Sequence, residues 1–136
     1  MTRSVDRTRV LLGVGTLVAA VATAGSLFLS LGLGLVPCDL CWYQRILMYP
    51  QVVAFGVAAF EGRATAYRTV LPLAVPGAAL AAYHSWLQVA SGGRCTVGGA
   101  CASVQLRAAG LTIPNLSLVA FLLVAGVATA LWLGER

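Results

Sequence analysis

Four long apolar stretches constrain the fold of this chain more than any other feature of its sequence. They cover residues 10–36, 42–60, 69–90 and 114–133, and each is near the ~20 residues that a helix needs to cross a bilayer. Of the 136 residues, 60% are hydrophobic and 10% are charged, which leaves no room for a separate soluble domain. Lipid cannot satisfy an open backbone, and the alternating strands of a barrel are not apparent in the sequence. We therefore predict an all-α membrane protein, with residues 1–136 forming a single bundle of four transmembrane helices.

The start of the chain allows a second interpretation. The arginines at residues 3–9, the apolar stretch and the run Ala22-Thr23-Ala24 together resemble a signal peptide with a small-residue cleavage site. The apolar stretch continues to Val36, however, well beyond the point where a signal peptide would end. We expect the first stretch to remain as a membrane helix, and its partial processing stays an open alternative.

The arginines set the expected orientation. Six of the nine precede the first stretch, lie between the second and third stretches, or end the chain, whereas the other side holds Arg45, Arg94 and Arg107. The positive-inside rule then places both termini in the cytoplasm and the loops 37–41 and 91–113 outside. The arginines form no basic cluster with interleaved aromatic residues, so we expect lipid headgroups rather than nucleic acid as their partners.

The two outer loops carry all four cysteines. Two residues separate Cys38 from Cys41, and five separate Cys95 from Cys101. A disulfide closing either small ring would contribute only about 2 kcal/mol, so structural bridging explains these pairs poorly. A C-x-x-C ring is typical of an exchanging disulfide, in which one thiol attacks and its neighbour resolves.

Two other interpretations of the cysteines stay open. They could form inert extracellular bridges, or four thiolates could bind zinc or copper. The five-residue spacing and the oxidising outer face argue against metal, and we expect no metal site.

Arg45 favours the redox interpretation. It lies one helical turn after Cys41 and on the same face, where it can stabilise a thiolate together with the N-terminal end of the helix. The same charge can stabilise negative charge on the carbonyl oxygen of an electron acceptor. The alternative is that Arg45 extends to lipid headgroups.

The electrons need an acceptor, and the sequence has no haem, flavin or dinucleotide fingerprint. A membrane quinone, ubiquinone or menaquinone, fits a site at the outer boundary. His84 is expected at nearly the depth of Arg45, and Tyr49 and Gln88 follow these two residues by one turn, so all four are candidates for the quinone site. The alternative for His84 is a hydrogen bond to a neighbouring helix.

Several motifs resemble the DsbB family of disulfide-generating membrane proteins, and most closely its BdbC branch. The resemblance extends over nearly the whole chain and includes the Tyr83-His84 pair, the second cysteine pair, the run Ile113-Pro114-x-Leu116-Ser117-Leu118, and the run Pro37-Cys38-x-Leu40-Cys41-Trp42-Tyr43-Gln44-Arg45-Ile46. It implies a four-helix bundle in the bacterial inner membrane. Such a protein reoxidises a secreted thioredoxin-fold thiol oxidase, of the DsbA or BdbD kind, and passes the electrons to a quinone.

The resemblance also implies roles for individual residues. Cys41 would engage the quinone, Cys38 would face the second loop, and Arg45 and His84 would belong to the quinone site. Cys95 would be attacked by the partner and Cys101 would resolve. The five-residue spacing of this pair leaves open which of its sulfurs is attacked. A quinone and dithiol enzyme similar to vitamin K epoxide reductase is the alternative function, and a thiolate metal-binding membrane protein is a more distant one.

Overall fold

The computed structural model describes residues 2–90 and 107–136 of the chain. Helices form almost all of the described part, which confirms the all-α prediction. In chain order the elements are α1 (Thr2–Leu27), the π-helical segment η1 (Phe28–Gly32), α2 (Asp39–Glu61), the 3₁₀ turn η2 (Ala64–Ala66), α3 (Tyr67–Ala90), the strands β1 (Arg107–Ala108) and β2 (Leu111–Thr112), and α4 (Ile113–Glu135). The two strands pair in an antiparallel hairpin, in which Arg107 lies opposite Thr112.

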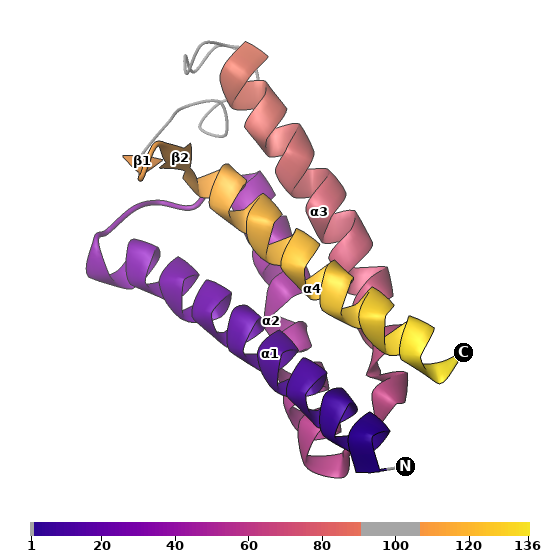
Figure 1. Ribbon diagram of the computed structural model, residues 1–136. Helices are drawn as coiled ribbons and strands as arrows, with labels where there is room; N and C mark the ends of the chain where they lie inside the picture. The colour runs from indigo at the N-terminus through magenta and orange to yellow at the C-terminus, as the bar shows by residue number, and fades with distance from the viewer. Residues whose placement is uncertain (1, 91–106) are drawn as a thin grey trace.

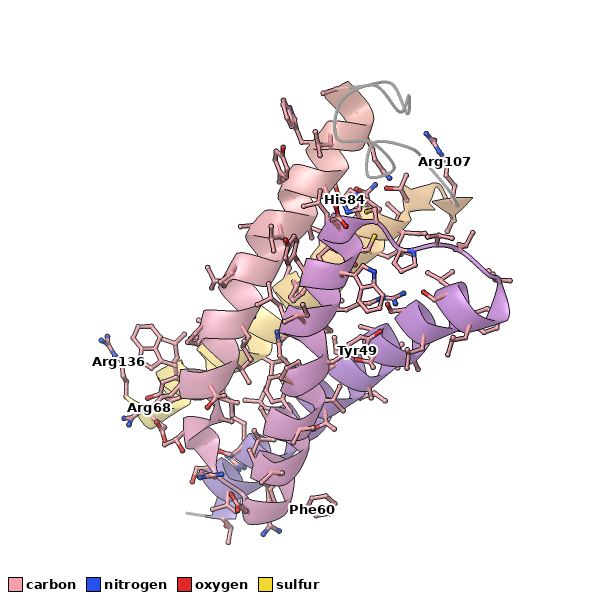
Figure 2. All side chains as sticks on the ribbon, turned by 180° about the vertical axis from the view of Figure 1, so that it is seen from behind. Tyr49, Phe60, Arg68, His84, Arg107 and Arg136 are labelled. Atoms are coloured by element: carbon pink, nitrogen blue, oxygen red, sulfur yellow. The ribbon has the colours of Figure 1, made fainter. Side chains whose placement is uncertain are left out.

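The four long helices form a bundle in which α1 and α3 each pack against both α2 and α4 (Figure 1). The N-terminus and the C-terminus lie at the same end of this bundle, and the hairpin lies at the other end. Figure 2 shows the same polarity, because His84 and Arg107 lie toward the hairpin end, whereas Phe60, Arg68 and Arg136 lie toward the end that holds the termini.

Small residues bring the helices close together. On α1, Gly15 lies against the ring of Phe55 on α2, where an added Cβ would approach a ring carbon to 2.7 Å. On α3, Gly77 lies against Phe121 of α4, where the corresponding distance would be 2.1 Å. Both phenylalanines are buried. Membrane helices associate through such close packing, because lipid provides no hydrophobic driving force between them.

The first helix differs from the predicted stretch 10–36 at both ends. It begins at Thr2, because the charged residues before Val10 extend the helix instead of preceding it. It ends through η1 at Gly32 and not at Val36. Gly34, with a φ of 69°, adopts a left-handed backbone conformation that glycine accepts at little cost and that a helix cannot continue.

The second helix starts earlier than the predicted residue 42, so the predicted outer loop 37–41 is wrong at its C-terminal end. The backbone of Cys38 is extended and caps the helix, and Asp39 is its first residue. Pro37 ends the preceding loop, and a carboxylate in the first turn is favoured by the helix dipole. Cys41 therefore lies within the first turn of α2 and not in a loop. The predicted stretches 69–90 and 114–133 differ from α3 and α4 by at most two residues at each end.

Three helices of the described part are long and apolar enough to cross a membrane by length and composition, namely Thr2–Gly32, Ala64–Ala90 and Ile113–Glu135. The remaining helix, α2, has 23 residues, as α4 does, and packs between α1 and α3. Its sequence is more polar than the apolar windows of the other three long helices, because it contains Asp39, Gln44, Arg45 and Gln51. The chain is therefore a multi-pass membrane protein, and α2 and α3 carry the buried polar side chains between its helices.

Candidate redox site and acceptor cavity

Cys38 and Cys41 form a dithiol at the N-terminal end of α2. Their Sγ atoms are 3.3 Å apart and both side chains are partly buried. The amide of Trp42 donates to the carbonyl oxygen of Cys38, which closes the first turn of the helix between the two sulfurs. The positive end of a helix dipole stabilises negative charge, so this position favours the thiolate form on which disulfide exchange depends.

Arg45 points from α2 toward the end of α1. Its Nη2 donates to the carbonyl oxygen of Ser26, at 3.1 Å, and to the hydroxyl of Ser30 in η1. Its guanidinium also lies 5.3 Å from the centre of the Trp42 ring. The side chain is partly buried and held by both neighbouring segments. A guanidinium has five N–H donors, and both of these hydrogen bonds come from one nitrogen. Arg45 is therefore held against α1 and η1, with its side chain partly buried.

A cavity of about 620 Å³ lies between α1, α2 and α4. Cys41, Arg45 and Tyr49 line it from α2, and the Tyr49 hydroxyl donates to Ser26 Oγ at 3.3 Å. Most of the remaining lining is apolar, including Leu17, Val21, Phe28, Val119 and Leu123. These five side chains are also exposed on the outside of the bundle. The cavity consequently opens between α1 and α4, toward the face that lipid would cover, and both Arg45 and Cys41 line it.

His84 lies beside the dithiol and not in this cavity. Its Nε2 is 3.8 Å from Cys38 Sγ, and its Nδ1 is 3.0 Å from Nε2 of Gln44. It is 2% exposed, and of the described residues that line the cavity none belongs to α3. Gln88, one turn further along α3, is also buried away from the cavity. The structure thus brings Arg45 and Tyr49 together at the cavity, and places His84 on the other side of α2.

Cys38, Cys41 and His84 are also a group of soft donor atoms, all within 4.8 Å of one another. No fourth His, Cys, Asp or Glu joins them among residues 2–90 and 107–136. Two thiolates and an imidazole can also hold a zinc ion with an open fourth position, so this geometry fits both the redox interpretation and the metal alternative. Cys95 and Cys101, which the sequence predicts as the second pair, lie outside the described residues.

Three polar residues of the site were not predicted from the sequence. Ser26 and Ser30 hold Arg45, and their spacing of four residues within an apolar helix was a usable signal, because it places both side chains on one face. Gln44 is 5% exposed and directly precedes Arg45. A polar side chain in an apolar helix needs a buried hydrogen-bond partner. This requirement therefore singles out Gln44 as well as Arg45.

Known proteins with similar sequences identify the family of this chain. The family model described as "Disulfide bond formation protein DsbB" matches residues 7–131. "Disulfide bond formation protein C" of Bacillus subtilis is 41% identical over 112 residues, which cover 79% of this chain and 81% of that protein. A "Probable disulfide formation protein" of Deinococcus radiodurans is 43% identical over 121 residues, covering 79% of each chain.

A third relative, the "Probable disulfide formation protein" of Oceanobacillus iheyensis, is 39% identical over 112 residues, covering 78% of this chain and 77% of that protein. No solved structure matches the chain. The family match spans almost the entire sequence, including the dithiol and all of the described helices except their outermost turns. The chain therefore belongs to the DsbB family of disulfide bond formation proteins.

Proposed function

We propose that this disulfide-generating membrane oxidoreductase transfers electrons from the Cys38/Cys41 dithiol to a quinone bound in the cavity between α1, α2 and α4. The observation that carries the proposal is that Cys41 lines the same cavity as Arg45. The cavity then contains both the sulfur that gives up electrons and a fixed positive charge, and it opens toward lipid. Other members of the family carry names that describe disulfide formation, and this transfer is the step that would regenerate the disulfide.

The residues present fit a quinone. The cavity volume of about 620 Å³ lies within the usual range of small-molecule sites, and its apolar sides suit an aromatic ring with a hydrocarbon tail. Within the cavity, the N–H groups of Arg45 are donors for a carbonyl oxygen. When bound, a quinone accepts two electrons and two protons. The chain contributes the orientation of the ring through Arg45 and Tyr49, and it contributes the reacting sulfur through Cys41.

The second cysteine pair supplies the route from the partner protein in this proposal. A thiolate of a secreted thioredoxin-fold oxidase attacks the Cys95/Cys101 disulfide, and a second thiol of the oxidase then displaces the bound cysteine, which leaves the oxidase as a disulfide and the pair as a dithiol. This dithiol then reduces the Cys38/Cys41 disulfide. The position of Cys38 before the first turn of α2, rather than inside the cavity, supports its role as the sulfur that meets the second pair. Each exchange forms one disulfide and breaks another, so two electrons move inward at each step.

The proposal includes an orientation. All four long helices cross a bacterial inner membrane, with both termini in the cytoplasm and the dithiol at the outer face. Both chain ends lie at one end of the bundle, and Arg68 and Arg136 lie toward the same end (Figures 1 and 2). An excess of arginine on this side supports a cytoplasmic location under the positive-inside rule. The outer face is also where disulfides persist.

Trapping the partner tests the proposed function. In cells that express a Cys101→Ala variant, the Cys95 thiolate can attack the disulfide of an oxidised partner, and Cys101 is not present to displace the partner again, so a covalent adduct should accumulate on Cys95. Mass spectrometry should then identify a thioredoxin-fold protein in the adduct. The matched control is Cys95→Ala, which removes the proposed target sulfur and should give little adduct. An adduct in the control alone would exchange the roles of the two cysteines, and no adduct in either variant would contradict the proposed partner.

A further inference from the structure

A buried polar connection crosses from α2 to α3 at the level of the dithiol; of its members, Gln44 also lines the cavity, whereas His84 and Cys38 do not. It links Gln44, His84 and Cys38 through contacts of 3.0 Å and 3.8 Å. Gln44 is 5% exposed and His84 is 2% exposed. Burying polar groups is costly unless they are hydrogen-bonded. A buried histidine therefore needs a hydrogen-bond partner for each of its two ring nitrogens.

The orientation of the Gln44 amide determines which ring nitrogen of His84 carries the proton. The amide nitrogen of Gln44, which is only a donor, faces Nδ1. Nδ1 must therefore accept, and a neutral His84 carries its proton on Nε2. Nε2 is the atom that faces the Cys38 sulfur. With its proton in this position, Nε2 can donate to a thiolate at Cys38 and cannot act as a base toward the thiol.

We propose that Gln44 is a positioning residue that holds His84 as the Nε2-protonated tautomer, and that His84 in turn stabilises the Cys38 thiolate by a hydrogen bond. The inference rests on the proposed function only because it assumes that Cys38 exchanges as a thiolate. The inference assigns different roles to the two polar side chains, Arg45 and His84. Arg45 serves the acceptor in the cavity, and His84 serves the sulfur that exchanges with the second pair.

On α2, the ionisable groups near Cys38 are the Cys41 thiol, whose Sγ lies 3.3 Å away, the exposed Asp39, and Arg45, which donates to Ser26 and Ser30. The outer half of α3 has no ionisable side chain besides Tyr83 and His84, and α4 has none before Glu135. The N-terminal end of α2 adds a second stabilising contribution to the thiolate. A substitution of His84 on α3 therefore removes one stabilising contribution to the Cys38 thiolate and leaves the N-terminal end of α2 unchanged.

The experiment uses the fact that the sequence contains one histidine. In the full chain, reduced in detergent and without a histidine tag, ¹⁵N-histidine NMR reports the protonation of each ring nitrogen of His84 alone. We expect Nδ1 to be unprotonated and Nε2 to be protonated in the unsubstituted protein. Gln44→Glu should move a proton to Nδ1, because a carboxylate only accepts. Gln44→Leu should give a mixture of tautomers.

The matched control is Gln51→Leu. Gln51 is a buried glutamine on the same helix, and its Nε2 donates to the Leu47 carbonyl oxygen. This variant should keep the tautomer of the unsubstituted protein. A proton on Nδ1 in the unsubstituted protein, a mixture of tautomers there, or the same spectrum for both Gln44 variants would overturn the inference. The first of these tests needs no variant, so a misfolded Gln44→Leu protein does not weaken the experiment.

A second readout measures the thiolate itself. In a background in which the other three cysteines are serine, ultraviolet absorbance gives the thiolate fraction of Cys38 as a function of pH. His84→Phe should lower the ratio of thiolate to thiol at a given pH by about tenfold, as expected for a lost hydrogen bond to a charged group. An unchanged ratio would refute the role of His84. Neither measurement uses quinone or a partner protein, so a failure here is distinguishable from a failure of the proposed function.

Discussion

Filling the cavity with a side chain should block electron transfer without disturbing the fold. Gly25 on α1 lines the cavity, and an added Cβ at this position meets no heavy atom within 4 Å. The side chain of a Gly25→Leu variant would therefore occupy space that the proposed quinone uses. Gly13, on the same helix, also has no heavy atom within 4 Å of an added Cβ, and it does not line the cavity. Gly13→Leu is the matched control.

The size of the effect follows from the contacts that the ligand loses. The leucine side chain displaces roughly four methylene-sized contacts of the ring or tail, at about 0.8 kcal/mol each. The loss of about 3 kcal/mol corresponds to about a hundredfold weaker binding. The stability of the helix should not fall in either variant, because leucine has a higher helix propensity than glycine by about 0.8 kcal/mol.

The assay is steady-state reduction of a water-soluble quinone analogue by the purified protein, with a reduced dithiol as electron donor. Gly25→Leu should raise the KM for the quinone about a hundredfold, and Gly13→Leu should behave as the unsubstituted protein. Equal KM values for both variants and the unsubstituted protein would refute the assignment of this cavity. A loss in both variants would show that the effect comes from α1 as a whole and not from the cavity.

Three further predictions address the charge, the sulfurs and the packing. Arg45→Gln should raise the KM for quinone by about ten- to hundredfold, because charge-assisted hydrogen bonds contribute about 1.5–3 kcal/mol, and a stopped-flow assay should show thiol exchange at the dithiol much less affected. Replacing any one cysteine by alanine should abolish catalytic reoxidation of the partner, measured by thiol trapping; full turnover in any of these variants would refute the relay. Gly77→Ala should destabilise the bundle by about 1–3 kcal/mol, since its Cβ would meet the Phe121 ring, whereas Gly126→Ala, with no heavy atom within 4 Å of its Cβ, should not. Denaturation in mixed detergents measures this difference, and equal stability would contradict the packing described for α3 and α4.

The helices could be predicted from the sequence because hydrophobic length is a direct requirement of the bilayer. The ends could not, since they depend on backbone preferences that hydropathy ignores. Gly34 ends the first helix with a left-handed conformation while apolar residues continue to Val36. Cys38 caps α2, so that Cys41 lies in this helix and not in the predicted loop 37–41.

The site was predictable in part for a similar reason. Arg45 and Tyr49 follow Cys41 at helical spacing, and one helix places all three along the same cavity. The direction of His84 depends on how α3 rotates against α2, and its distance along the chain says nothing about this rotation. Depth alone predicts a shared site with Arg45, whereas in the structure His84 contacts Gln44 and Cys38.

The most direct test of the account is a single-turnover measurement on the isolated dithiol. A variant in which Cys95 and Cys101 are alanine is fully reduced, mixed with a quinone under anaerobic conditions, and analysed by mass spectrometry for the Cys38–Cys41 disulfide and by absorbance for hydroquinone. We predict one hydroquinone for each disulfide formed, because the dithiol gives up two electrons and two protons. Hydroquinone without the disulfide, or a dithiol that stays reduced in the presence of excess quinone, would contradict the claim that these two sulfurs pass their electrons to an acceptor in the membrane.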